Sequence, residues 1–122
     1  MRYEGATAEL DRTLMALADP VRRRIVERLR AGDTRVTDVA AGFPISLNSV
    51  SKHIRLLERA GLVMRRVEGR QHFLSFRAEP LQSVQDWIAE QQAFWQGRLQ
   101  AIDDLLAAED AARTEADEGD RA

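Results

Sequence analysis

A run of polar side chains between Asn48 and Arg55 carries the groups of this chain that are best suited to chemistry. If the run is helical, Val50 and Ile54 mark an apolar face and the polar groups occupy the opposite one. A short amide or hydroxyl can pair with the edge of a nucleic-acid base, whereas lysine and arginine reach phosphates or guanine. The alternative is an amphipathic surface helix without a ligand, because polar helix faces are common.

Arginines also gather around Gly69, in the turn signal Glu68-Gly69-Arg70. This cluster consists of Arg65, Arg66 and Arg70. The flanking segments 62–67 and 71–77 are rich in β-forming residues, so we expect a hairpin. A guanidinium at its tip could enter a minor groove or contact a phosphate. The alternative is a solvated hairpin whose arginines only prevent edge-to-edge aggregation.

Other chemistries find little support in the sequence. The chain has no cysteine, which excludes disulfides, thiolate ligands and thiol switches. Its only two histidines, His53 and His72, fall short of the three or four ligands of a zinc site, so we expect neither a metal nor a cofactor. The adjacent carboxylates at 103–104 and 109–110 have no nucleophile or base beside them and are interpreted as solvated charges. We therefore expect no enzymatic activity.

Two helices are predicted before the polar run. Leucines at 10, 14 and 17 recur at helical spacing and indicate a first helix of about three turns. Asp19-Pro20 marks the start of a second helix, because the carboxylate can accept unpaired amide hydrogens and proline tolerates the first position. Gly32 ends this helix. Its arginines, Arg22, Arg23, Arg24 and Arg28, are expected largely outward.

A short helix and a capped helix complete a helix-turn-helix pattern. Thr37-Asp38 can cap a third helix over residues 38–41, and Ser46 can cap a fourth over 47–60. A helix-turn-helix presents its second helix to the major groove. Leu47, at the start of that helix, can contact a thymine methyl group or pack beneath the turn; we favour packing.

After the hairpin, Pro80 starts a long amphipathic helix over 80–108, on the order of 40 Å in length. Its apolar residues keep steps of three and four, and the stripe is too wide for a body of about 70 residues to cover. We expect a two-fold homodimer, the alternative being a core helix of a monomer. The expected interface consists of Leu10, Leu14, Leu17, Trp87, Ile88, Phe94, Trp95, Leu99, Ile102 and Leu106.

Charge is unevenly distributed over the 122 residues. Through Arg77 there are 15 Lys and Arg against 9 Asp and Glu, a net of +6, and the remainder carries 3 against 11, a net of −8. This asymmetry favours a nucleic-acid surface in the first part and a solvated or self-associating second part. The alternative is two ordinary solvated surfaces.

Length and composition favour one domain, residues 9–108, between a flexible arm (1–8) and an acidic disordered tail (109–122). No apolar run is long enough for a membrane helix, and the first residues lack the apolar segment of a signal peptide. We therefore expect no membrane partner and a cytoplasmic, nucleoid-associated protein.

Three segments resemble one known family. They are LADPVRRRIV at 17–26, SLNSVSKHIRLLERAGLV at 46–63 and the glycine-arginine pair at 69–70, and the likeness extends over residues 10 to about 106. The family is that of the ArsR/SmtB winged-helix repressors. The resemblance implies that 46–60 is a recognition helix, that 62–77 is a wing and that the first and last helices form the dimer interface.

Departures from the family pattern concern its metal sites. The metal-sensing members carry a cysteine motif in the third helix, or histidine and carboxylate ligands in the last helix. Here the third helix reads Thr37-Asp-Val-Ala-Ala41 and the last helix has no histidine. The chain is therefore identified as similar to a non-metal-sensing subgroup, and the resemblance names no effector.

The sequence thus predicts a mainly helical α+β fold with a small β-hairpin, in the order α-α-α-α-β-β-α. The predicted function is that of a transcription regulator, a repressor by resemblance, that binds double-stranded DNA at an inverted repeat. The expected DNA-contacting residues are Thr37, Ser46, Asn48, Ser49, Ser51, Lys52, His53, Arg55, Arg66 and Arg70. The alternative is a winged-helix module for protein–protein interaction, or a switch that responds to a metal or a ligand.

Overall fold

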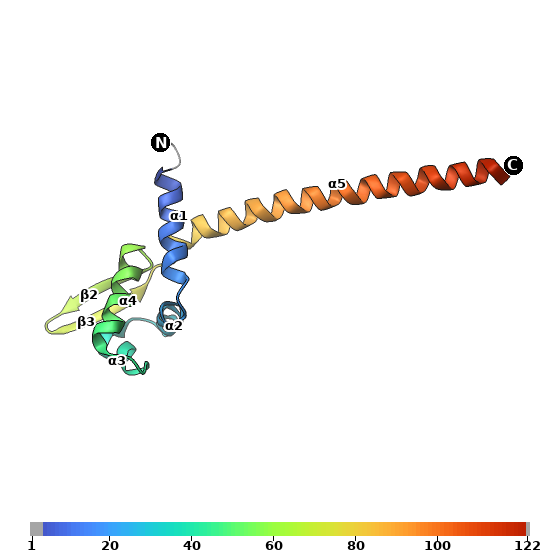
Figure 1. Cartoon of the computed structure of the whole chain (residues 1–122). Helices are drawn as coiled ribbons and strands as arrows, with labels where there is room; N and C mark the ends of the chain where they lie inside the picture. The colour runs from blue at the N-terminus through green and yellow to red at the C-terminus, as the bar shows by residue number, and fades with distance from the viewer. Residues whose placement is uncertain (1–3, 122) are drawn as a thin grey trace. The chain divides into compact units, whose positions relative to one another are not determined.

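The computed structural model describes residues 4–121, and the chain divides into two units, 1–85 and 86–122. Along the chain the elements are α1 (Glu4–Leu17), α2 (Pro20–Arg28), the 3₁₀ turn η1 (Leu29–Ala31), β1 (Thr34–Arg35), α3 (Val36–Ala41), α4 (Leu47–Arg59), β2 (Val63–Glu68), β3 (Gln71–Phe76) and α5 (Leu81–Arg121) (Figure 1). The first unit holds the elements from α1 to β3, and the second unit is the greater part of α5.

The start of α2 follows the Asp-Pro signal. Asp19 has extended backbone angles, and its Oδ1 accepts hydrogen bonds from the backbone N–H of Val21 at 2.8 Å and of Arg22 at 3.2 Å. Pro20 occupies the first turn, where no N–H is needed. The helix ends through η1 at Gly32, whose φ of 120° suits a residue without Cβ. The predicted start and stop of this helix are confirmed.

Both ends of the chain are more helical than expected. α1 begins at Glu4, inside the segment 1–8 that we expected to be flexible, and residues 1–3 lie outside the described part. α5 runs to Arg121, through most of the segment 109–122 that we expected to be disordered. The tail lacks large apolar residues, but alanine, glutamate and arginine have high intrinsic helix propensity, which accounts for the difference.

The sheet has three strands rather than two, in the order β1-β3-β2. β1 pairs antiparallel with β3, with Thr34 opposite Leu74 and Arg35 opposite Phe73. Because α3 follows β1 directly, Arg35 is its N-cap residue and gives no side-chain cap bond. The predicted cap at Thr37-Asp38 is therefore wrong, since both residues lie inside α3.

The hairpin of β2 and β3 matches the turn signal. The antiparallel register runs from Val63 opposite Phe76 to Glu68 opposite Gln71, which leaves a two-residue loop. Gly69 has a φ of +62° and occupies the first loop position, an arrangement that fits a type II′ turn. The loop therefore exposes the next residue, Arg70, at the tip.

The core of the first unit lies between α2, α3, α4 and the sheet (Figure 1). α4 contributes the predicted stripe, Val50, Ile54 and Leu57, all fully buried. The sheet side contributes Leu74, and Leu62 lies just before β2. Because this stripe fixes the rotation of α4 about its own axis, the face opposite to it is directed to solvent.

Candidate nucleic-acid interface

The outward face of α4 consists of Asn48, Lys52 and Arg55. At about 100° per residue these positions lie opposite the buried stripe, and all three are exposed. Their side chains have no hydrogen bond or ion pair with any other residue of the described part. The helix begins as predicted, because Ser46 Oγ accepts from the Ser49 backbone N–H at 3.1 Å. Ser46 also donates to Ser49 Oγ at 3.0 Å, so both hydroxyls serve the cap.

His53 lies on the flank of α4 that meets α2, not on its outward face. Its Nδ1 accepts a hydrogen bond from the Arg22 guanidinium at 3.1 Å and lies 3.9 Å from Asp19 Oδ1. The same guanidinium donates to the carbonyl oxygens of Ala16 at 2.7 Å and Met15 at 3.0 Å, at the end of α1. His53 and Arg22, expected to face DNA and solvent respectively, instead join α1, α2 and α4.

The carboxyl group of Asp19 takes part in the same junction. Its partial desolvation by itself raises the pKa, but hydrogen bonds from the backbone of Arg22 and Val21, and the charges of His53 and Arg22, lower it more strongly. The net result is a pKa below the ordinary value. Asp19 therefore stays ionised as the cap of α2.

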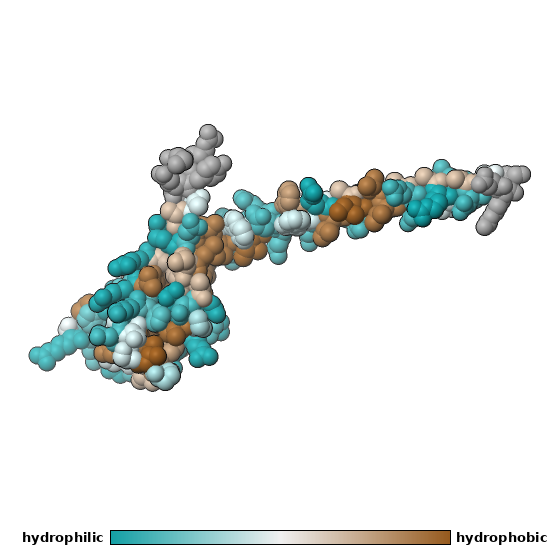
Figure 2. Space-filling model, in the orientation of Figure 1, coloured by the Kyte–Doolittle hydropathy of each residue, from teal (hydrophilic) through white to brown (hydrophobic). Residues whose placement is uncertain are grey.

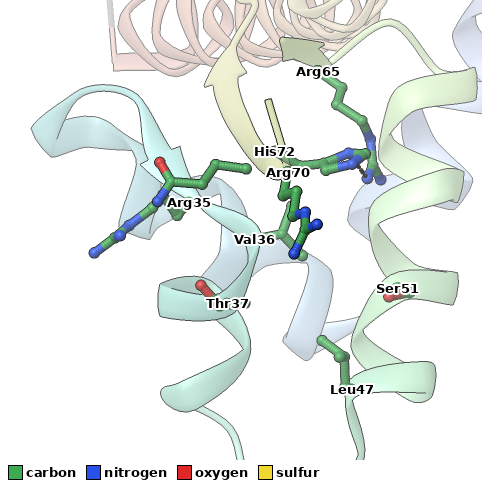
Figure 3. A pocket seen from close by; sticks show the side chains of 9 residues that line it. Arg35, Val36, Thr37, Leu47, Ser51, Arg65, Arg70 and His72 are labelled. Atoms are coloured by element: carbon green, nitrogen blue, oxygen red, sulfur yellow. Dashed lines mark hydrogen bonds between the residues drawn. The ribbon is translucent and has the colours of Figure 1, made fainter. Parts of the chain in front are cut away.

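The opposite flank of α4 is joined to the hairpin by Arg65. Its guanidinium donates to Glu58 Oε1 at 2.8 Å and Oε2 at 3.4 Å, a forked ion pair. It also donates to His72 Nδ1 at 3.0 Å, a bond drawn in Figure 3. The Arg65–Glu58 ion pair thus holds the hairpin against α4, and His72 contacts Arg65 from within the same hairpin. Glu58 was not among the residues expected at the interface.

Arg66, an expected DNA contact, lies on the other face of the hairpin. Side chains alternate along a strand, so Arg66 points away from the face on which Arg65 meets α4. It forms ion pairs with Asp33 at 3.2 Å and Glu68 at 3.1 Å. Its guanidinium also lies 5.0 Å from the centre of the Phe73 ring. Its charge is therefore neutralised within the protein, unlike that of Arg70.

A groove of about 380 Å³ separates α3, α4 and the hairpin (Figure 3). The expected contacts Thr37, Ser51 and Arg70 line it, and Arg70 is exposed with no ion pair to any described residue. The groove is also lined by Leu47 and Arg65, for which a DNA contact was one of two interpretations, and by residues that were not among the expected contacts: Arg35, Val36, Gln71 and His72. Leu47 is 54% exposed, so the packing role that we favoured for it is wrong.

The apolar stripe of α5 is open to solvent along the helix, where Figure 2 shows repeated brown patches. Trp95 is 59% exposed, and Leu105, which the spacing argument missed, is 62% exposed. The other expected interface residues of this helix, Trp87, Ile88, Phe94, Leu99, Ile102 and Leu106, are also exposed. In α1, Leu14 is exposed, whereas Leu10 and Leu17 are half-buried. An apolar surface of this extent is typical of an association site.

Within the described part, no three His, Asp or Glu side chains come together in a group that could hold a metal ion.

No helix within residues 4–121 combines the length and the apolar character needed to cross a membrane.

Comparison with known proteins places this geometry in a family. A helix-turn-helix domain family matches residues 17–66. The transcriptional repressor SdpR of Bacillus subtilis is 30% identical over 79 residues, which cover 65% of this chain and 88% of SdpR.

Two solved structures extend the comparison. The crystal structure of an ArsR family transcriptional regulator is 37% identical, with a TM-score of 0.71, and covers 74% of this chain and 93% of its own. A homodimeric winged helix-turn-helix DNA-binding domain of Mycobacterium bovis, solved by NMR, is 22% identical with a TM-score of 0.60. That match covers 76% of this chain and 88% of the other, and it shows the same fold. The predicted winged-helix fold is confirmed, and the chain belongs to the ArsR/SmtB family of winged-helix transcriptional regulators.

Proposed function

We propose that this protein is a DNA-binding transcriptional repressor that acts as a homodimer on an inverted repeat. The observation that carries the proposal is the set of unpaired polar and cationic side chains on one surface: the outward face of α4 together with Arg70 at the hairpin tip. The relatives named as a repressor and as a transcriptional regulator support the same role. Members of this family are regulators, not enzymes.

Each part of this surface has a place on B-form DNA. α4 would enter the major groove, where Asn48 can pair with a base edge and Lys52 and Arg55 can reach phosphates or guanine. The hairpin tip would bring Arg70 to the adjacent minor groove, which attracts arginine where it is narrow, and to the phosphates that border it. The bond of Arg65 to Glu58 supports this arrangement, because it holds the hairpin beside α4.

The exposed apolar stripe of α5 supports the homodimer. Tryptophan and phenylalanine side chains bury roughly 150–250 Å² each when covered, so pairing with a second copy would remove a large apolar area from water. Together with Leu10, Leu14 and Leu17 of α1, the stripe would form a closed two-fold interface. Two recognition helices about 34–36 Å apart would then contact the two half-sites.

The test is a gel shift with DNA from upstream of the protein's own gene, at about 50 and 200 mM salt, combined with sedimentation of the free protein. We expect a dimer whose binding weakens steeply with salt, since phosphate contacts release counterions. A monomer, or equal retention of every DNA sequence, would contradict the proposal. An acidic protein captured in place of DNA would favour the interaction module.

The proposal has two further parts, the independence of DNA binding from metal ions and the place of the protein in the cell. We propose that DNA binding does not depend on a metal ion, because the chain lacks cysteine and its two histidines bond to Arg22 and Arg65. Addition of zinc to the gel shift is expected to leave the affinity unchanged; a zinc-dependent loss of binding would show a metal-responsive switch. A regulator of this kind works in the cytoplasm at the nucleoid, which fluorescence microscopy of a tagged copy can test.

A further inference from the structure

Leu47 is the first residue of α4 and an unusual one for its position. It follows the cap residue Ser46 and stays 54% exposed, although the next apolar residues of the helix, Val50 and Ile54, are fully buried. It is also absent from the apolar core of the first unit. A leucine that lies outside the core and within a basic groove is available to a ligand that carries an apolar group.

The surroundings of Leu47 define that group. Figure 3 shows Leu47 on α4 across the groove from Val36 and Thr37 on α3, with the Arg70 side chain above them. The half-buried Val36 side chain therefore provides the second apolar wall. The arginines of the groove suit a ligand with anionic groups, and the apolar walls suit a small apolar projection between α3 and α4.

In the major groove only one base carries such a projection, the C5 methyl group of thymine. Residues in the first turn of a recognition helix are those that contact base edges. A leucine side chain has no hydrogen-bonding group, so it cannot distinguish guanine, adenine or cytosine by donor and acceptor patterns. We propose that Leu47 is a specificity-determining residue that contacts the methyl group of one thymine in each half-site. The inference rests on the proposed role of α4 as the recognition helix.

The experiment removes the methyl group and the leucine separately. Full-length protein selects its preferred duplex from a random-sequence DNA library, and each thymine of the half-site is then replaced by deoxyuridine, which lacks only the C5 methyl. Loss of one buried methyl contact corresponds to about a fourfold change in affinity, and about fifteenfold when both half-sites of a dimer are changed. Affinities are measured for the wild type and for Leu47→Ala.

Leu56→Ala is the matched control, because Leu56 is an exposed leucine of the same helix. It is 41% exposed and lines a different cavity, beside α1. We expect one thymine per half-site at which replacement by uracil lowers the DNA affinity of the wild type and of Leu56→Ala equally. In Leu47→Ala this difference between thymine and uracil should disappear, with the helical circular dichroism unchanged because the side chain is exposed.

A second selection with Leu47→Arg gives an independent result. Arginine pairs with the O6 and N7 atoms of guanine through two hydrogen bonds, so the selected base pair should change from T·A to one that contains guanine at that position. Three results would each overturn the assignment and leave DNA binding itself intact: uracil tolerated at every position, a thymine preference that persists in Leu47→Ala, or an unchanged selection with Leu47→Arg. Failure to select any duplex would refute the proposed function as well.

Discussion

Two arginines of the hairpin were expected to contact DNA, but the structure shows that they differ in ion pairing. This difference gives a quantitative prediction. Arg66 and Arg70 lie four residues apart in one hairpin, but only Arg66 has carboxylate partners, Asp33 and Glu68. The slope of log K against log salt is negative, and each arginine that neutralises a phosphate adds about 0.9 to its magnitude. Arg70→Ala, which removes two such contacts from a dimer, should therefore reduce the slope by about 1.8.

The slope converts into a ratio of affinities. Between 50 and 200 mM salt, the advantage of the wild type over Arg70→Ala should shrink about twelvefold. Lys52→Ala should behave in the same way, because Lys52 is exposed on the outward face of α4 without a partner in the described part. Arg66→Ala should leave the slope nearly unchanged, since the Arg66 guanidinium is paired with Asp33 and Glu68 and does not neutralise a phosphate.

Fluorescence anisotropy titrations at four or five salt concentrations would measure these slopes, with sedimentation confirming that each variant remains dimeric. The reasoning would be refuted if Arg66→Ala and Arg70→Ala reduced the slope equally. In that case the ion pairs of Arg66 would open on binding, and local pairing in the free protein would not predict which cations reach DNA.

The remaining predictions concern the dimer and the helix caps. Trp95→Glu, which places a charge in the exposed stripe of α5, should give a monomer by sedimentation and abolish tight DNA binding, whereas Ala93→Glu, on the opposite side of the helix, should remain dimeric. Ser46→Ala should lower the free energy of unfolding by about 1 kcal/mol in urea titrations, because the Ser49 N–H loses its acceptor; an unchanged midpoint would show that the cap is dispensable. Because the pKa of Asp19 is lowered by folding, its ionised form stabilises the fold above the ordinary carboxyl pKa of about 3.9 and this stabilisation is lost as the pH falls below that value. Asp19→Asn, which keeps a cap acceptor, should therefore flatten the acid limb of thermal stability, and a limb as steep as that of the wild type would assign the acid sensitivity to other groups.

Local signals were sufficient for the elements that position the interface. The Asp19-Pro20 start, the Ser46 cap and the stripe of Val50 and Ile54 each depend on residues within a few positions of one another. Helical periodicity then fixes which face of α4 is buried, so the outward face could be derived from the sequence. The hairpin was equally accessible, because its turn needs a residue that tolerates positive φ.

Interactions between distant residues explain what the sequence did not reveal. β1 has only two residues, too few for any periodicity, and it exists because it pairs with β3 some 40 positions later. His53 bonds to Arg22, and Arg66 to Asp33, across similar gaps in sequence. The rotation of α4 could have warned against His53, because it lies next to the buried Ile54 and on the flank of the helix.

These long-range pairs change how much of the +6 net charge of residues 1–77 is available for DNA binding. Arg65 and Arg66 are held by carboxylates, and of the basic residues around the groove and the outward face of α4, Lys52, Arg55 and Arg70 remain without partners in the described part. Three free cations per subunit predict a salt slope of about −5 for the dimer, whereas counting Arg65 and Arg66 as well would give about −9. A measured slope near the steeper value would mean that DNA competes successfully with Glu58 and Asp33, and that the hairpin moves from α4 when the protein binds.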